Sequence, residues 1–452
     1  MSKINLNKIK KIHFIGIGGI GISAIAKMMA LEGKEVSGSD ASENKITDQL
    51  KKLRVIIHIG HSEKNFDSDV ELVIYTIAIT KDNPELKKAR RLKIPILSYP
   101  QALGALSKDH YTVAISGTHG KTTTTAMIAK ICIDAGLEPT VIVGSLLDPH
   151  TTTNKVRTTK GSHLFSVGAS NFIAGKSNLF IVEACEYRES FLNLYPRILA
   201  ITNIDNDHLD YYKTVGNIYK AFKKIARKIP STGYLICNLS NKEIRRLTKG
   251  LNCHIIDYSL QPENITLKVP GQHNRENAKI ALAIAEILKV ERSRAKKYLK
   301  GFSGTWRRFE YKGKTKTGTH IYDDYAHHPT EIKASLSAFR ERFPRHKITV
   351  VFQPHLFSRT KALLNDFADS FNDADKIILA PIYAAREKPS KGISSKILFK
   401  KLKKKKNNVL FFENFEKIEK YLKLNPHISK NDIIITMGAG DIYKIGEALA
   451  RS

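Results

Sequence analysis

The sequence predicts an α/β protein of three domains, each with a mostly parallel sheet covered by helices. Short apolar runs alternate with helical patterns along the whole chain, as they do in βαβ units. A length of 452 residues suits two to four domains, and 42% hydrophobic with 26% charged residues is an ordinary globular composition. We place the boundaries near Leu106 and Gly304, which predicts domains over residues 1–106, 107–303 and 304–452.

The expected strands are short apolar runs that end in polar residues or turns. The clearest are residues 12–17, 72–75, 111–116, 179–184, 198–204, 233–238, 319–324, 348–353, 376–381 and 432–437. The clearest helices are residues 21–33, 121–136 and 275–288. Residues 148–178 are polar and rich in Thr, Ser and Gly, which predicts a long loop. Ligands of such sheets bind beyond the carboxyl ends of the strands, so candidate sites are expected there.

Composition excludes several classes of protein. The net charge of +31 would suit a nucleic-acid partner, but the basic residues are dispersed, and the densest run, residues 400–406, reads as a solvated helix end. We therefore expect no nucleic-acid partner. Acidic nucleotide substrates would also account for a locally basic surface. No apolar run approaches the ~20 residues of a membrane span, and the start lacks a signal-peptide pattern, which predicts a cytoplasmic protein. Four scattered cysteines predict neither a disulfide framework nor a zinc knuckle.

Two glycine-rich loops follow strands. The first, Gly16-x-Gly18-x-x-Gly21, precedes a helix pattern and Asp40, and taken alone it indicates a dinucleotide site. The second, "GTHGKTTT" over residues 117–124, is a phosphate loop of another kind. Its lysine would reach the β- and γ-phosphates, and the hydroxyl of the following threonine would ligate Mg²⁺. Isoleucine stands where the usual pattern begins with glycine, so this loop is shorter.

Polar residues at later strand ends are candidate ligands. Glu183 and His208 are candidate metal ligands near the phosphates, since carboxylate oxygen suits Mg²⁺ and histidine also suits Mn²⁺. On spacing alone, three aspartates could serve in place of His208: Asp205, Asp207 and Asp210. Asn274 could pair with an adenine edge, and it is equally a good helix N-cap.

The C-terminal third repeats this arrangement twice. "DDYAHHP" at residues 323–329 could suggest a zinc site by composition, yet its place between a strand and a proline-started helix favours a substrate or nucleotide role. "QPHLFSRT" at residues 353–360 contains His355 and Arg359, whose guanidinium could hold a carboxylate in bidentate fashion.

In combination, these motifs resemble those of the Mur ligases, over nearly the whole chain and in the same order. The matching segments are "FIGIGGIG", "SGTHGKTTT", "EACE", "NIDNDHLDYY", "GQHNREN", "RRFE", "DDYAHHPTE", "FQPHLFSRT" and "TMGAGDIYKIG". The resemblance implies a Rossmann-like N-terminal domain that binds a UDP-sugar, a central P-loop ATPase-type domain, and a Rossmann-like C-terminal domain. It therefore argues against a nicotinamide site, although the same physics of glycines at a helix N-terminus serves either pyrophosphate.

The resemblance also implies a role for each candidate residue. UDP-sugar contacts would come from Gly18, Gly19, Ile20, Gly21, Asp40, His61 and Thr76. ATP contacts would come from Gly117, Thr118, His119, Gly120, Lys121, Thr122, Thr123, Asn274, Asn277, Arg308 and Asp324. Two Mg²⁺ ions, for which Mn²⁺ could substitute, would be held by Thr122, Glu183 and His208. The incoming amino acid or its acceptor would contact Tyr325, His327 and Arg359, and the catalytic set would be Lys121, Glu183, His208, His327 and Arg359.

Three departures from the family pattern stand out. Ile77 replaces a hydroxyl residue beside Thr76, and Leu356 stands where many relatives have arginine. Cys185 stands where the commoner motif has aspartate, and we interpret it as a buried structural thiol. The lysines of residues 220–224 are left out of the site.

The activity implied is an ATP-dependent, carboxylate–amine ligation in peptidoglycan precursor synthesis. L-Alanine would be joined to the lactyl carboxylate of UDP-N-acetylmuramate through an acyl phosphate, by a monomer or homodimer. The alternative is the murein-recycling reaction, which joins a stem tripeptide to the same sugar. A folylpolyglutamate synthase, a dehydrogenase or a nucleic-acid-binding protein would each leave some of these motifs unexplained.

Overall fold

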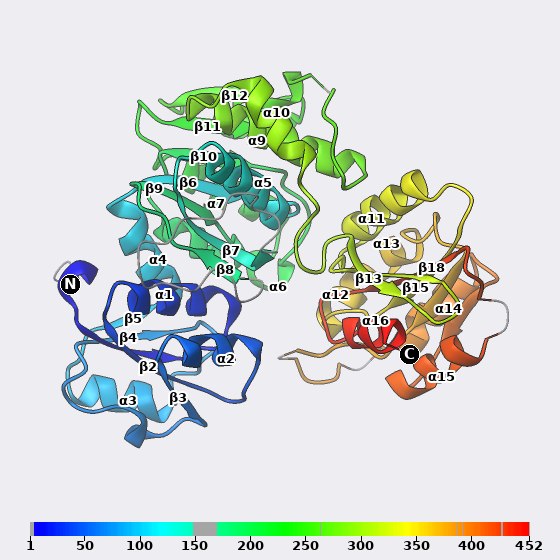
Figure 1. Ribbon diagram of the computed structural model, residues 1–452, viewed down its shortest axis with the longest axis horizontal. Helices are drawn as coiled ribbons and strands as arrows, with labels where there is room; N and C mark the ends of the chain where they lie inside the picture. Colours follow the sequence, from blue (N-terminus) through cyan, green and yellow to red (C-terminus); the bar gives the residue numbers. More distant parts are fainter. Residues whose placement is uncertain are drawn as a thin grey trace. The chain divides into compact units, whose positions relative to one another are not determined.

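The protein has an α/β fold with three β-sheets, each covered by helices, as the sequence predicts (Figure 1). The computed structural model describes residues 4–147, 170–262, 264–385, 387–390, 392–425 and 428–451. By contacts the chain divides into two compact units, one of Met1–Ile265 with Asn277–Lys300 and one of Thr266–Glu276 with Gly301–Ser452. Each unit is described by itself. Within the described ranges, no helix is long and apolar enough to span a bilayer.

The first sheet has five parallel strands in the order β3-β2-β1-β4-β5. Its strands are β1 (Lys11–Ile15), β2 (Glu35–Asp40), β3 (Ile56–Ile59), β4 (Leu72–Tyr75) and β5 (Ile96–Ser98). Its helices are α1 (Ile20–Leu31), α2 (Lys45–Lys52), α3 (Pro84–Arg91) and α4 (Tyr99–Lys108). Alternation along β1 directs Phe14 toward α1, α2 and α4, and Ile15 toward α3. The strand order reverses beside β1, so the Gly16–Gly19 loop lies at a switch point of the fold.

The second sheet, in the same unit, has seven strands in the order β12-β11-β10-β6-β9-β7-β8. Its strands are β6 (Tyr111–Ser116), β7 (Thr140–Leu147), β8 (Ser170–Ile173), β9 (Leu179–Glu183), β10 (Ile198–Ile201), β11 (Tyr234–Cys237) and β12 (His254–Asp257). Its helices are α5 (Lys121–Asp134), α6 (Leu209–Tyr212), α7 (Val215–Ala226), α8 (Lys242–Thr248), α9 (Gln272–Ile287) and α10 (Arg292–Lys300), and a 3₁₀ segment, η5 (Tyr187–Asn193), follows β9. Only the β7–β8 pair is antiparallel among these strands. Strand β6 lies at the centre, and its carboxyl end feeds the phosphate loop.

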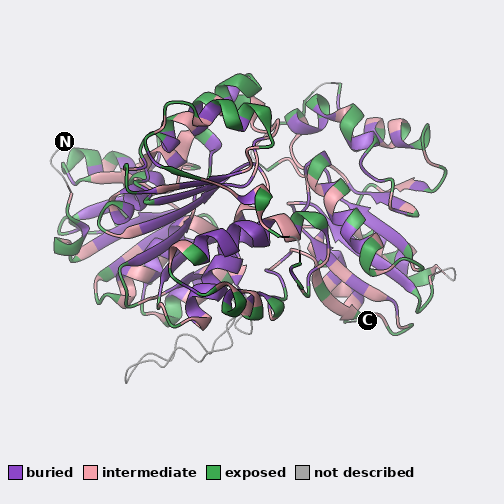
Figure 2. Ribbon diagram, turned by 90° about the horizontal axis from the view of Figure 1, so that it is seen from above, coloured by how far each residue is buried: buried purple, intermediate pink, exposed green. Residues whose placement is uncertain are grey.

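The third sheet belongs to the second unit and has the order β13-β14-β18-β15-β16-β17. Its strands are β13 (Glu310–Lys314), β14 (His320–Asp324), β15 (Lys347–Phe352), β16 (Lys376–Leu379), β17 (Val409–Phe411) and β18 (Asp432–Met437). Its helices are α11 (Pro329–Arg342), α12 (Phe357–Ala362), α13 (Leu364–Ala368), α14 (Ser395–Lys403), α15 (Phe415–Leu424) and α16 (Tyr443–Ala450). Helices α11, α13 and α14 cover one face, and α15 and α16 cover the other. Figure 2 shows the resulting pattern, with buried strands between helices whose outer faces are exposed.

The ten predicted strands are all present, but the predicted 148–178 loop is partly wrong. Ser170–Ile173 form β8, which pairs with β7 at the edge of the second sheet. The strand was missed because four residues after a polar stretch carry too little alternation to be recognised. Residues 148–169 of that prediction lie outside the described residues.

The first two sheets are joined through a buried polar contact on α1. Lys27 Nζ donates to Asn171 Oδ1 and to Gln49 Oε1, both at 2.7 Å. The Asn171 amide in turn donates to Ser23 Oγ at 2.9 Å and to the carbonyl of Ile20. Strand β8 of the second sheet is therefore tied to the first turn of the helix that follows the first glycine loop.

Candidate active site

The phosphate loop connects β6 to α5 in a conformation that requires glycine. Gly117 and Gly120 have φ of 133° and 81°, in the left-handed region that side chains avoid. A Cβ at Gly117 would lie 1.9 Å from Thr202 Oγ1, so the neighbouring strand end also excludes a side chain. The strand–loop–helix predicted for this segment is confirmed, and α5 begins at Lys121.

The Lys121 ammonium folds back over this loop. Its Nζ donates to the carbonyls of Gly117 at 2.5 Å and Thr118 at 3.0 Å, and it lies 2.9 Å from Glu186 Oε2. Burial alone would lower the pKa of Lys121, but the negative charges around it, that of Glu186 foremost, together raise that pKa above its ordinary value. The lysine is therefore cationic, as a phosphate ligand must be.

The first turn of α5 meets the end of β9. Thr122 Oγ1 donates to Glu183 Oε2 at 3.0 Å, and the Gly144 amide donates to the same oxygen at 2.8 Å. A Cβ at Gly144 would lie 2.8 Å from either carboxylate oxygen, so only glycine leaves room there. A hydroxyl and a carboxylate beside a phosphate loop are oxygen donors of the kind that Mg²⁺ prefers, so these two residues fit a Mg²⁺ site.

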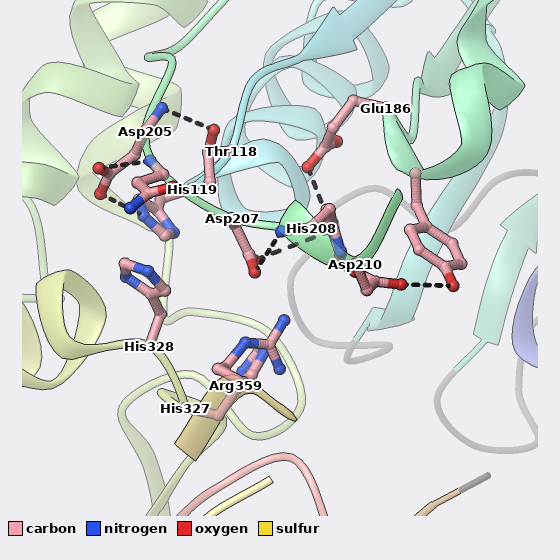
Figure 3. Close-up of polar contacts among 12 residues, drawn as sticks. Thr118, His119, Glu186, Asp205, Asp207, His208, Asp210, His327, His328 and Arg359 are labelled. Atoms are coloured by element: carbon pink, nitrogen blue, oxygen red, sulfur yellow. Dashed lines mark hydrogen bonds and ion pairs between the residues drawn. The ribbon is translucent and has the colours of Figure 1, made fainter. Parts of the chain in front are cut away.

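The loop is braced by the segment after β10. Asn203 accepts the His119 amide on Oδ1 at 2.9 Å, and the Asp205 amide donates to Thr118 Oγ1 at 2.9 Å. His119 Nε2 lies 3.0 Å from Asp205 Oδ2. Figure 3 shows Asp205 against Thr118 and His119. Asp205 thus supports the loop.

His208 lies beside a second carboxylate. Its Nε2 is 3.6 Å from Glu186 Oε1 and 3.8 Å from Asp207 Oδ2, two contacts that Figure 3 marks. Its ring packs on that of Tyr187, with 4.8 Å between the ring centres. His208 has a φ of 55°, which turns the chain sharply before α6. The structure therefore pairs Thr122 with Glu183 and His208 with Glu186.

The two asparagines predicted to contact adenine both lie on α9. That helix begins at Gln272, so Asn274 is not its N-cap, and the capping alternative is wrong. The side-chain amide of Asn274 donates instead to the Pro270 carbonyl at 2.6 Å. Asn277 is buried, and its Oδ1 would lie 2.5 Å from a Cβ at Gly120. Asn277 is thus placed directly against the phosphate loop.

The first glycine loop is contacted by the carboxylate of Asp40, at the end of β2. Asp40 Oδ2 accepts the Gly18 amide at 2.8 Å, and a Cβ at Gly18 would lie 3.0 Å from that oxygen. Asp40 therefore shapes the loop. Gly21 packs on Tyr99, whose ring would lie 2.7 Å from a Cβ at that position. Thr76 contacts the loop from β4, since its methyl group would lie 2.4 Å from a Cβ at Gly16.

His61 is held by a buried carboxylate that sequence reasoning missed. Its Nδ1 lies 3.0 Å from Ser39 Oγ and 3.3 Å from Glu85 Oε2. Glu85 is fully buried and accepts hydrogen bonds from Ser39 Oγ at 2.6 Å and Asn65 Nδ2 at 2.5 Å. Although burial favours the protonated acid, these donors and His13 hold the pKa of Glu85 below its ordinary value.

In the second unit, the adjacent residues Arg307 and Arg308 have different surroundings. Arg307 is buried, and its guanidinium donates to Asp323 Oδ2 at 2.7 Å and to the carbonyls of Gly438 at 2.5 Å and Gly440 at 2.9 Å. Arg308 lies over the Tyr325 ring at 5.0 Å and 4.0 Å from a Glu331 oxygen. Arg307 is therefore structural, whereas the contacts of Arg308 are a longer ion pair and an aromatic ring.

Asp324 is also committed to the backbone. Its two carboxylate oxygens accept the amides of Phe309 and Ala326, both at 2.9 Å. Burial raises the pKa of Asp324, and the nearby Arg308 opposes that rise. The side chain therefore fixes the strand end from which any contact with ATP would be made.

The remaining predicted residues of the second unit form one aromatic and basic group. His327 Nδ1 lies 3.0 Å from the Tyr325 carbonyl, and its ring packs edge-on against His355 at 5.5 Å. Arg359 Nη1 lies 3.0 Å from His355 Nδ1. His328 caps α11 with Glu331 in a capping box, which is a structural role. The structure thus brings Tyr325, His327 and Arg359 together through His355.

Two departures from the family pattern have structural outcomes. The interpretation of Cys185 as a buried thiol is wrong, because it is exposed, whereas Cys132, Cys237 and Cys253 are buried. Leu356 has a φ of 69° at the start of α12, a conformation that leucine rarely adopts.

Three family models match the chain. "Mur ligase family, catalytic domain" matches residues 11–111, "Mur ligase middle domain" matches 115–268, and "Mur ligase, glutamate ligase domain" matches 307–440. A curated relative from Clostridium acetobutylicum, named UDP-N-acetylmuramate–L-alanine ligase, is 42% identical over 97% of each chain.

Two solved structures are similar over 98% of each chain. The UDP-N-acetylmuramate-alanine ligase of Thermotoga maritima has a TM-score of 0.78 at 29% identity. A murein peptide ligase of Psychrobacter arcticus has a TM-score of 0.70 at 24% identity, which shows a shared fold.

Proposed function

The chain belongs to the Mur ligase family, and on this premise we propose that it joins L-alanine to the lactyl carboxylate of UDP-N-acetylmuramate with the cleavage of ATP. The observation that carries the proposal is the phosphate loop, in which a cationic Lys121 and the Thr122–Glu183 pair meet at the end of β6. Such a reaction belongs to peptidoglycan precursor synthesis, and its nucleotide substrates place it in the cytoplasm.

The ATP site comprises the loop residues 117–123, with Asn277 beside Gly120. Backbone amides at the start of α5 face the phosphates, and Lys121 follows the transferring group as charge develops. Asn274, Arg308 and Asp324 complete the nucleotide contacts. Thr122 and Glu183 would hold one Mg²⁺ ion and His208 would hold a second, with Mn²⁺ as an alternative ion; bound ions would offset the charge of the phosphates.

The UDP-sugar occupies the first glycine loop, where the Gly18–Gly21 segment at the N-terminus of α1 donates backbone hydrogen bonds to its pyrophosphate. Asp40, His61 and Thr76 line the same loop. The lactyl carboxylate attacks the γ-phosphorus, which gives an acyl phosphate and ADP. The amine of L-alanine then attacks the acyl carbon, and phosphate leaves. His327, Arg359 and Tyr325 position the amino acid or its acceptor.

The rival reaction is addition of a stem tripeptide to the same sugar. It is not favoured, because the relative named for L-alanine addition is 42% identical, whereas the murein peptide ligase structure is 24% identical. The two activities differ only in the amine, so direct comparison of amines separates them.

The test is ADP release with UDP-N-acetylmuramate and each amino acid or the stem tripeptide in turn. We expect L-alanine to give the highest kcat/KM. Lys121→Ala should remain folded, because Gly117 and Gly120 keep the loop, and it should still bind the UDP-sugar. It should release no ADP. A folded Lys121→Ala enzyme that released ADP at the wild-type rate would overturn the proposal.

A further inference from the structure

Glu186 is a buried carboxylate that lies between two residues of the proposed site. Its side chain is 3% exposed. One end meets the phosphate loop, where Oε1 and Oε2 lie 3.1 Å and 2.9 Å from Lys121 Nζ. On the other side, Oε1 lies 3.6 Å from His208 Nε2, as Figure 3 shows. Glu183 accepts the hydrogen bond of the Thr122 hydroxyl, whereas Glu186 pairs with Lys121, so the two acids have different partners.

The backbone around Glu186 is held in place. Its carbonyl accepts hydrogen bonds from the Tyr212 hydroxyl and from the Glu189 amide, the latter at 2.9 Å. Arg188 and Glu189 follow with φ of 52° and 55°, which reverses the chain directly after the acid. Two strained residues in succession cost free energy, and such strain persists only where the surroundings enforce it. The backbone that carries Glu186 is therefore fixed beside Lys121.

The contacts of Lys121 are complete in this state. An ammonium has three hydrogens, and the carbonyls of Gly117 and Thr118 together with Glu186 supply three acceptors. A phosphate oxygen must displace one acceptor to reach the ammonium. The two carbonyls belong to the loop itself, so the displaced acceptor is Glu186, the only one that is charged.

A displaced Glu186 would face the phosphates at close range. Two anions that share one cation repel each other, and the repulsion is strong in a poorly hydrated site. Free ATP brings all its charge to the site, whereas ATP with a divalent ion brings less. The same carboxylate thus opposes the free nucleotide more than the metal complex.

We propose that Glu186 is a positioning residue that holds Lys121 against the loop and so makes nucleotide binding depend on the divalent ion. This inference rests on the proposed ATP site. Glu186 competes with the triphosphate for one ammonium, and metal-bound ATP wins that competition where free ATP does not. After displacement, the carboxylate keeps its contact with His208, 3.6 Å away.

The test uses the full-length enzyme with Glu186→Gln, which keeps the shape and one acceptor but removes the charge. The matched control is Glu189→Gln, three residues along the chain, whose carboxylate instead pairs with Lys224 at 3.0 Å. Calorimetric titration gives Kd for ATP in chelator and in Mg²⁺. For Glu186→Gln, Kd for free ATP should tighten by about tenfold, which is ~1.4 kcal/mol, as expected when a charged competitor is removed. Kd for the Mg²⁺ complex should change by less than about threefold, and kcat should fall because Lys121 is no longer aligned.

If Glu186 were only structural, Glu186→Gln would weaken the binding of both forms of ATP. Tighter binding of free ATP therefore distinguishes the proposed role from a structural one. Equal Kd values for free ATP in wild type and Glu186→Gln would overturn the inference, as would the same shift in Glu189→Gln. If Glu186→Gln melts early, Glu186→Asp withdraws the charge from Lys121 and should also tighten free ATP. Lys121→Ala separates the two levels: if it abolishes ATP binding while Glu186→Gln behaves as wild type, only the Glu186 inference fails. If Lys121→Ala binds ATP normally, the ATP site itself is wrong.

Discussion

Replacing Lys27 by methionine should change how the stability of the first unit depends on pH. Lys27 is 3% exposed, and its ammonium donates to the amide oxygens of Gln49 and Asn171. Burial without a compensating charge lowers the pKa of Lys27 to about 8. The lysine of the unfolded chain titrates near its ordinary pKa of 10.5, so between about pH 8 and 10.5 the unfolded state binds more protons. Stability from this group therefore rises with pH across that window.

The magnitude follows from the two pKa values. From pH 7.5 to 9.5, the wild type should gain about 2 kcal/mol of unfolding free energy relative to Lys27→Met, which has no group to titrate there. Urea unfolding followed by circular dichroism at pH 7.5, 8.5 and 9.5 measures the difference. Lys45→Met, at an exposed position of α2, is the control and should run parallel to wild type. Equal pH slopes for wild type and Lys27→Met would refute the assignment of a buried, uncompensated ammonium.

Three further predictions concern the phosphate loop. Gly117→Ala should destabilise the enzyme by roughly 2–4 kcal/mol in urea and abolish ADP release, because its φ of 133° and the 1.9 Å approach to Thr202 exclude a methyl group; an unchanged urea midpoint would contradict this. Glu183→Ala and His208→Ala should stay folded by circular dichroism but lose about 10²–10³-fold in turnover, and near-normal rates at saturating Mg²⁺ in both would mean that the metal site is misplaced. Thr122→Ala should raise the Mg²⁺ concentration needed for half-maximal ADP release roughly tenfold or more, and Thr122→Ser should restore it; failure of serine to rescue would argue against a hydroxyl ligand.

The strand–loop–helix elements were predictable because their signals are local. Gly117 and Gly120 predict a turn with positive φ, and the apolar run before them predicts a buried strand. The α/β class and the ten strands followed from the same kind of pattern. β8 did not, since its four residues gain their strand conformation from pairing with β7.

The contacts within the site depend on distant segments and were not predictable in the same way. Nothing local distinguishes Arg307 from Arg308, and only the third sheet shows that the first is bound by Asp323 and the Gly438 carbonyl. Glu186 was visible in the "EACE" segment, three residues after Glu183, but its contact with Lys121 needs the tertiary structure. The roles assigned to the individual site residues stay predictions until the variants are measured.

The exposed Cys185 gives the enzyme a natural attachment point for a reporter. The other three cysteines are buried, so a thiol-directed fluorophore would be confined to one residue, next to Glu186 and close to the phosphate loop. The thiolate is the reactive form of cysteine, so the rate of labelling at Cys185 senses the charge of the neighbouring Glu186. Arrival of a nucleotide, or a change in the charge at position 186, would then be readable as a change in labelling rate on the unmodified chain, without radioactive substrate or coupled enzymes.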